Sequence, residues 1–321
     1  MNATLLEKPP ETAVLPPPRP AKRLLRRIIA NRYMYILILP GFFYFLLFRI
    51  FPMSMLIMAF ENYSPYTGVF KSDWVGFQNF ITLFQNPHFY VLFRNTLAIN
   101  ILALVFCFPL PIILAILLNE VRVGWFKKLN QTIVYLPHFL SWVVVVSLTF
   151  FTLSVDVGVI NKILTTLGLK SVSFLSNSSY FWGIITVQTM WKDTGWGTII
   201  FLAAISGVDI QQYEAAALDG AGRLKQIWHI TLPAIQPTIA VLLILKIGNL
   251  MNVGFEQVLL MMNPLVYNVA DVFDTFTYTM GIQQGNISLG VTVGLFKGIV
   301  ALILVFFSNY IVKKLGNEGI Y

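Results

Sequence analysis

The sequence predicts an all-α integral membrane protein with six transmembrane helices. The chain has 321 residues, of which 57% are hydrophobic and only 11% are charged, whereas charged residues make up about a quarter of a soluble domain. The apolar residues gather into long runs, and about 20 of them suffice to cross the hydrocarbon core as a helix. Because the runs lack the alternation of barrel strands, helices satisfy their backbone in lipid. The six runs cover residues 33–60, 96–118, 132–153, 181–206, 235–262 and 289–312.

Residues 1–32 are expected to form a tail before the membrane domain. Its prolines prevent regular helix, and the apolar run that follows is too long for a signal peptide and lacks a cleavage site, so it is expected to be an uncleaved first span. The membrane domain then covers residues 33–314, and residues 315–321 form a second tail. A cluster of five basic residues lies just before the first run: Lys22, Arg23, Arg26, Arg27 and Arg32.

The placement of Lys and Arg predicts that both termini are cytoplasmic. Short cytoplasmic loops of membrane proteins are enriched in basic residues, and here these residues concentrate on one side of the predicted topology. The net charge of +8 is therefore interpreted as a topology signal, and no nucleic acid is expected as a partner. Beyond the amino-terminal tail, the residues on that side are Arg122, Lys127, Lys128, Arg223, Lys225, Lys313 and Lys314.

One external segment has the pattern of a short amphipathic helix. In residues 158–169 (GVINKILTTLGL), Val159, Ile163 and Leu167 recur at helical spacing, which is typical of a helix lying along a membrane surface. Two roles stay open for this helix, a docking platform for a partner or a connector at the interface.

The loop at residues 207–237 carries the strongest functional signal. A helix-forming run ends at Leu218, glycines follow at positions 220 and 222, and a second short run ends before Pro233. This order predicts two short cytoplasmic helices with a bend at the glycines. Tied at both ends to membrane helices, such a pair can transmit displacement to another protein.

A motif within this loop resembles the EAA loop of permease subunits in binding-protein-dependent ABC importers. The pattern is E-A-A, three residues, G, nine residues, I-x-L-P, and seven positions satisfy it: Glu214, Ala215, Ala216, Gly220, Ile230, Leu232 and Pro233. The flanking sequence, the six runs and the external segment are similar to the carbohydrate branch of these permeases, especially to those that import oligosaccharides.

The resemblance implies a fold, partners and a coupling site. The fold would be that of type I ABC importers, in a bacterial cytoplasmic membrane, with the loop docked in a cleft of an ABC ATPase dimer. A second homologous permease and an extracytoplasmic solute-binding protein are implied as partners, together with membrane lipid. No cofactor, metal or catalytic residue is expected here, because the chain lacks a phosphate-binding loop, and ATP and Mg²⁺ belong to the ATPase. The implied coupling residues are Glu214, Ala215, Ala216, Asp219, Gly220, Ala221 and Pro233.

Polar residues inside the runs suggest a translocation pathway. Ionisable groups at membrane depth usually face a cavity or a partner. The alternatives to a pathway are that these residues form ion pairs with one another or that those nearer a span end snorkel to the membrane surface. In the fifth run, residues 249, 252 and 256 are expected on one helical face, which favours a pathway where sugars find hydrogen bonds and an aromatic face. The expected pathway residues are Gln188, Trp191, Lys192, Asp193, Lys246, Asn249, Asn252, Glu256 and Lys297.

The balance of these charges suggests an acidic cargo. If Asp193 pairs with Lys192, then Lys246 and Lys297 lack an acidic partner. Two uncompensated cations would favour an acidic oligosaccharide, such as a uronate oligomer related to alginate.

Glycines at positions 290, 294 and 298 of the last run predict close helix packing. Two other functions are alternatives to the importer, a secondary carrier and an intramembrane enzyme that processes polysaccharides. The chain has no convincing internal repeat for the carrier. It has no paired-carboxylate motif for the enzyme, and His88, His138 and His229 lie in separate loops or span ends.

Overall fold

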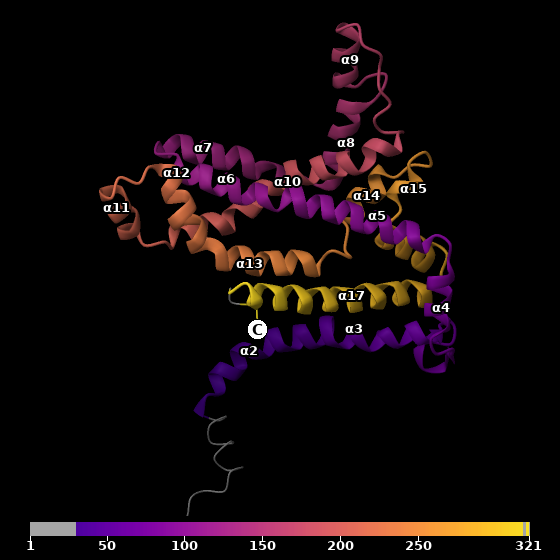
Figure 1. Cartoon of the computed structure of the whole chain (residues 1–321). Helices are drawn as coiled ribbons and strands as arrows, with labels where there is room; N and C mark the ends of the chain where they lie inside the picture. Colours follow the sequence, from indigo (N-terminus) through magenta and orange to yellow (C-terminus); the bar gives the residue numbers. More distant parts are fainter. Residues whose placement is uncertain (1–29, 317–318, 321) are drawn as a thin grey trace, which may run out of the picture. The chain divides into compact units, whose positions relative to one another are not determined.

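The computed structural model describes residues 30–316 and 319–320 and is built almost entirely of helices (Figure 1). Most of the tail predicted at residues 1–32 lies outside the described residues. The chain divides into two compact units, Met1–Leu56 and Ile57–Tyr321, which are considered separately below.

The first unit contains most of one long helix, which runs without interruption from Arg32 to Phe60. It confirms the first predicted span as a helix. Within it the hydrogen-bond pattern changes twice, in a π segment and in a final 3₁₀ segment that extends into the second unit. The parts are α2 (Arg32–Phe45), the π segment Leu46–Ile50, α3 (Phe51–Met53) and the 3₁₀ segment Ser54–Phe60.

The second unit holds the remaining elements. Its one small sheet pairs β1 (Glu61–Asn62) with β2 (Asp73–Trp74) in antiparallel orientation. The helices of its first half are α4 (Gln78–Gln85), α5 (Phe89–Leu102), the π segment Ala103–Cys107, α6 (Pro109–Glu120), α7 (Gly124–Tyr135), the 3₁₀ segment Leu136–Phe139, α8 (Trp142–Leu153) and α9 (Val159–Thr166). Those of its second half are α10 (Ser178–Ser206), α11 (Ile210–Leu218), α12 (Arg223–Gln226), the π segment Ile227–Thr231, α13 (Leu232–Gly248), α14 (Phe255–Met261), α15 (Tyr267–Ala270), α16 (Phe273–Phe276), the π segment Thr277–Gln283 and α17 (Ile287–Lys314).

Four helices in the described part of the chain are long and apolar enough to cross a membrane, and a bent pair brings the number to five. α10 has 29 residues and covers the predicted fourth span. It is not among the four, because polar side chains such as those of Lys192 and Asp193 lower its hydropathy. The structure therefore confirms an all-helical membrane protein with four to five candidate spans, while the count of six stays a prediction. The four helices are Arg32–Phe60, Phe89–Glu120, Arg223–Gly248 and Ile287–Lys314.

The third predicted span is not one straight helix. The segment Gly124–Phe139 and α8 meet at an angle of 100° across a short break. The expectation of a continuous helix over residues 132–153 is wrong because Pro137 lies in the 3₁₀ turn that ends the first arm. Ser141 then begins α8 by accepting a hydrogen bond from the Val144 amide. This 100° bend is called the elbow below.

The fifth predicted span is broken, and its boundaries differ from those expected. α12, the π segment after it and α13 form one helix from Arg223 to Gly248, passing through Pro233. The prediction of a second short helix that ends before Pro233 is therefore wrong. Proline is tolerated there since it lies in the first turn of α13, directly after a π segment. After Gly248 the chain leaves the helix until α14 begins at Phe255.

The bundle of the second unit is held by close packing around α10 and α17. Ala115, Phe201 and Ile235 belong to one buried apolar cluster that joins α6, α10 and α13. Gly195 of α10 lies directly against the Val134 carbonyl, where a Cβ atom would collide with backbone. In Figure 1, α11 lies at one end of this bundle and α15 at the other.

The glycine series in the last helix packs only in part. Gly290 lies against Gly281, so that a Cβ on Gly290 would come 3.1 Å from the Gly281 Cα. A Cβ added to Gly294 or Gly298 would meet no atom within 4 Å among the described residues. Close packing within the chain is thus confirmed for Gly290, and packing through the other two glycines stays a prediction.

Candidate functional site

A groove runs between α8 and α10 in the second unit. Its volume is about 710 Å³, within the range of small-molecule sites, about 300–1,000 Å³. Trp191 and Tyr180 of α10 are exposed and line the groove, and the hydroxyl of Thr149 lies on the wall that α8 provides. The other lining residues are mostly apolar, and they are Val145, Leu148, Thr152, Leu153, Phe174, Ser179, Gly183, Ile184, Val187 and Gln188.

A buried polar ladder ties the helices around this groove. The Gln188 amide donates to Thr149 Oγ1 at 2.7 Å, and its oxygen accepts a hydrogen bond from Gln257 of α14 at 2.9 Å. Gln257 also accepts from Thr189 and donates to the Ile185 carbonyl. Gln188, an expected pathway residue, is only 5% exposed. Its side-chain hydrogen bonds join α8, α10 and α14.

Lys192 and Asp193 do not pair with each other, so the condition for leaving Lys246 and Lys297 without an acidic partner is not met. The Lys192 ammonium donates to the carbonyls of His138 and Leu140, at 2.7 and 2.6 Å. Asp193 instead contacts His138, with 3.1 Å between the carboxylate and Nδ1. The sequence could not reveal these contacts, because the carbonyls become available only where the third span bends.

Lys297 is also paired, contrary to the prediction. Its ammonium contacts the carboxylate of Asp274 in α16. The second oxygen of Asp274 accepts the Val253 amide at 3.0 Å, within the break of the fifth span. Asp274, which the sequence did not single out, therefore connects α16, α17 and the broken backbone.

The break of the fifth span exposes polar groups. Asn249 and Asn252 are exposed in this non-helical segment, so they do not share a helical face with Glu256 as expected. Glu256 lies exposed in the first turn of α14. Lys246, in the last turn of α13, forms no ion pair or hydrogen bond within the described residues.

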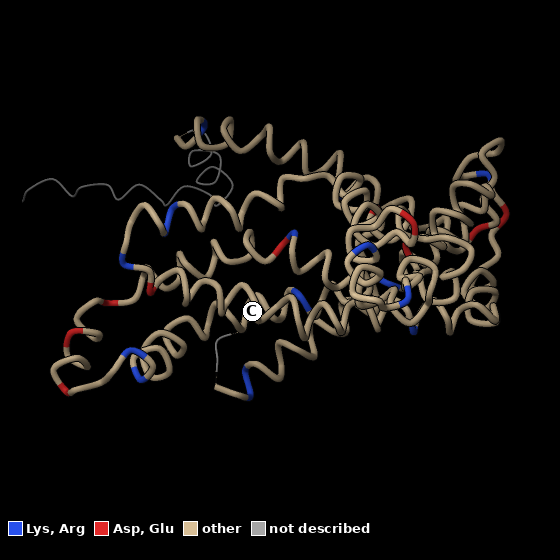
Figure 2. Tube along the Cα trace, turned by 90° about the horizontal axis from the view of Figure 1, so that it is seen from above, with Lys and Arg blue, Asp and Glu red and all other residues tan. Residues whose placement is uncertain are grey.

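The loop at residues 207–237 projects α11 from the bundle. No α11 residue is buried, and Glu214, Ala215 and Leu218 are exposed, whereas Ala216 is partly covered. Gly220 has φ of 75°, a left-handed conformation that favours glycine, and it allows the chain to turn from α11 into α12. Several charged residues gather at this end of the bundle (Figure 2).

Three contacts fix the orientation of this loop. The Tyr213 hydroxyl hydrogen-bonds Thr231 at 2.9 Å, and Gln226 donates to the Ala221 carbonyl at 3.1 Å. Arg223 forms an ion pair of 3.5 Å with Glu120 at the end of α6. The Tyr213 contact thus ties the exposed α11 to the helix that contains α13, and the ion pair of Arg223 ties that helix to α6.

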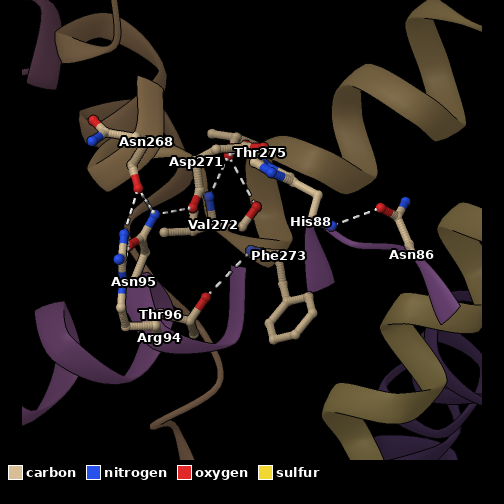
Figure 3. Close-up of polar contacts among 10 residues, drawn as sticks. All are labelled: Asn86, His88, Arg94, Asn95, Thr96, Asn268, Asp271, Val272, Phe273 and Thr275. Atoms are coloured by element: carbon tan, nitrogen blue, oxygen red, sulfur yellow. Dashed lines mark hydrogen bonds and ion pairs between the residues drawn. The ribbon is translucent and has the colours of Figure 1, made fainter. Parts of the chain in front are cut away.

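At the opposite end, a polar network anchors the segment around α15 to the start of α5 (Figure 3). The buried Asp271 carboxylate contacts His88 Nε2 at 2.8 Å and accepts the Thr275 hydroxyl at 2.5 Å. Asn95 donates to the Asp271 carbonyl, and Arg94 donates to the Asn268 carbonyl. No signal in the sequence predicted this network, because its members lie about 180 residues apart in the chain, 183 for His88 and Asp271.

Tyr267 borders this network outside the spans. Its ring stacks on His88 with centroids 5.6 Å apart. Burial, and to a lesser degree the neighbouring Asp271 carboxylate, raises the pKa of Tyr267 to about 12, so its hydroxyl keeps its proton at physiological pH.

These features define a class of protein, an integral membrane protein with broken spans, a groove and an exposed helix. The chain belongs to the family of binding-protein-dependent transport system inner membrane components, whose model matches residues 107–317. It is therefore a multi-pass transport permease of the inner membrane rather than an enzyme.

Two curated relatives from Bacillus subtilis (strain 168) align over most of the chain. Protein LplB is 54% identical over 91% of this chain and 92% of its own length. The polygalacturonan/rhamnogalacturonan transport system permease protein YteP is 50% identical over all of both chains. A chain of a bacterial alginate ABC transporter, solved in complex with an alginate pentasaccharide-bound periplasmic protein, has a TM-score of 0.85 and 40% identity, covering 93% of this chain and all of its own.

Proposed function

We propose that this chain is one of two permease subunits in an ATP-driven importer of acidic oligosaccharides. The observation that carries the proposal is the 50% identity with YteP along the whole of both chains. Polygalacturonan and rhamnogalacturonan, named for that relative, are polymers of uronic acid or contain it, and so is alginate, named for the structural relative. The shared property of these cargoes is a regularly spaced carboxylate.

The proposed pathway includes the groove between α8 and α10 and the break of the fifth span. Exposed rings of Trp191 and Tyr180 offer apolar faces to sugar rings, and exposed amides of Asn249 and Asn252 offer hydrogen bonds. Lys246, which forms no ion pair among the described residues, supplies the cation. Its attraction to a carboxylate of the cargo is stronger where water is excluded. Glu256 would add a carboxylate to the same pathway, while Lys192, Asp193 and Lys297 contribute through the helices that they hold.

The proposed coupling site is the loop at residues 207–237. Exposure of α11 supports docking to an ABC ATPase dimer that binds ATP and Mg²⁺. The proposed coupling residues are Glu214, Ala215, Ala216, Asp219, Gly220, Ala221 and Pro233. A second homologous permease would complete the pathway, and an extracytoplasmic solute-binding protein would deliver the cargo. In this arrangement α10 is the fourth of six spans, both termini are cytoplasmic and the membrane is that of a bacterium.

Uptake by cells tests the cargo class. Cells that carry the importer should take up labelled oligogalacturonate about tenfold faster than neutral arabino-oligosaccharides of equal length. Lys246→Ala should lower uptake of the acidic cargo about tenfold, the equivalent of about 1.4 kcal/mol, and leave residual uptake of neutral cargo unchanged.

Lys170→Ala is the matched control, since Lys170 is an exposed lysine in the loop after α9. It should leave both uptake rates at the level of the original chain. An equal loss for acidic and neutral cargo in Lys246→Ala would contradict the assignment of Lys246.

A further inference from the structure

Side chains from one turn of α10 contact the elbow in the third span. Lys192 donates to carbonyls on both sides of Phe139, the last residue of the first arm. Its ammonium also lies 5.4 Å from the ring centre of Trp142, the first residue of α8. A single side chain therefore contacts the end of the first arm, the break and the beginning of the second arm.

Two further contacts hold the same point. Asp193 hydrogen-bonds His138 through Nδ1, and the His138 ring stacks on Trp196 with centroids 4.6 Å apart and planes at 7°. Gly195, between them in sequence, admits the Val134 carbonyl. α10 thus contacts the elbow through the Lys192 ammonium, the Asp193 carboxylate and the Trp196 ring, and the absence of a Cβ at Gly195 allows the close approach.

The physical need for a cation at this place follows from the bend. Helix ends leave carbonyl groups without intrahelical donors, and such groups are costly in lipid, where water cannot replace the donors. They also carry the negative end of the helix dipole. An ammonium with three donors satisfies two carbonyls and the dipole together, and Lys192 is only 7% exposed.

The geometry points to Lys192 as a positioning residue that sets the direction of α8 and thereby the width of the groove. α8 forms one wall of the groove and α10 forms the other, with Trp191 lining the groove beside Lys192 in sequence. Holding α8 through its first turn fixes the wall that carries Thr149. This inference rests on the proposed role of the groove, but the position of α8 can be measured without cargo.

Spin-label distances test the inference directly. Because Cys107 is the one cysteine of the chain, a Cys107→Ser background accepts labels at Phe151→Cys on α8 and Ile200→Cys on α10, both exposed. The original lysine should give one narrow distance distribution in the assembled complex. Lys192→Met should shift or broaden it, and Lys192→Arg, which keeps a cationic donor, should restore it.

Transport supplies the second readout. In proteoliposomes Lys192→Met should lower uptake about tenfold, while ATP hydrolysis stimulated by the binding protein stays within about twofold, so more ATP is used per sugar. A variant that was merely less stable would lose both activities together. Lys170→Met, at an exposed lysine, should change neither.

Unchanged spin-label distances in Lys192→Met, or a proportional loss of uptake and ATP hydrolysis, would overturn the inference. If Lys192→Met does not assemble, Lys192→Gln and Trp196→Leu weaken the same contacts with less disturbance and are held to the same criteria. A failure of the proposed cargo would abolish uptake in the original chain too, and it would leave the distance measurement intact.

Discussion

Replacing Glu214 by Lys is expected to release the ATPase subunit while the membrane helices stay assembled. Glu214 is exposed on α11, so its loss leaves no buried group unpaired within the chain. Reversing a charge inside an interface typically costs 2–5 kcal/mol or more, and about 2 kcal/mol lowers affinity about 30-fold. The amount of ATPase that co-purifies with the permease measures this effect.

The matched control is Asp156→Lys. Asp156 is an exposed acid in the segment that joins α8 to α9, outside the loop that carries α11, and its reversal should leave co-purification unchanged. Undiminished association and uptake in Glu214→Lys would show that α11 does not dock the ATPase. Loss of the permease from the membrane would instead indicate a folding defect.

Replacing Asp274 by Asn is expected to destabilise the membrane helices. The Asp274 side chain is 22% exposed and that of Lys297 is 10% exposed, so the change leaves a buried ammonium without its counter-charge. Breaking a buried pair in this way costs about 3–5 kcal/mol. The midpoint of thermal unfolding in detergent should fall by several degrees, and Lys297→Met should act similarly because it strands the carboxylate.

The double variant Asp274→Asn with Lys297→Met separates pairing from simple loss of contacts. It should recover much of the lost stability, because neither charge is then left alone. Lys246→Met serves as the control, since Lys246 has no ion pair among the described residues, and its unfolding midpoint should stay near that of the original chain. Additive losses in the double variant would show that the pair contributes no coupling.

The long helices could be predicted because lipid imposes a simple rule on sequence. Runs at residues 96–118 and 289–312 became the helices Phe89–Glu120 and Ile287–Lys314, each a few residues longer at both ends. The segment at residues 158–169, predicted as a short helix, forms α9 (Val159–Thr166). In each case local apolar spacing was sufficient, since no contact with another helix was needed to define the element.

The breaks could not be predicted because they depend on partners far away in the chain. At the bend before α8, Lys192, more than 50 residues later, donates to two carbonyls, and at the break after Gly248 the Asp274 carboxylate accepts the Val253 amide. When the residues on both sides of a break are apolar, the sequence shows a single apolar run and predicts one continuous helix. For the same reason the sequence did not reveal that Lys297 has a partner in Asp274.

An acidic cargo is supported mainly by the relatives, whose named cargoes contain uronic acids. The sequence suggested two lysines without an acidic partner, and the structure leaves one of them, Lys246, because Lys297 contacts Asp274. Lys246 is therefore the cation within the proposed pathway that remains for an acidic cargo.

Transport by the complete importer, reconstituted in liposomes, tests the central claim most directly. The two permeases and the ATPase dimer are sealed in vesicles with internal ATP, and the binding protein and labelled oligogalacturonate are supplied outside. Accumulation is expected only when ATP, Mg²⁺ and binding protein are all present, with neutral oligosaccharides excluded. Accumulation driven by an ion gradient without ATP, or equal accumulation of neutral cargo, would contradict an ATP-driven importer of acidic oligosaccharides.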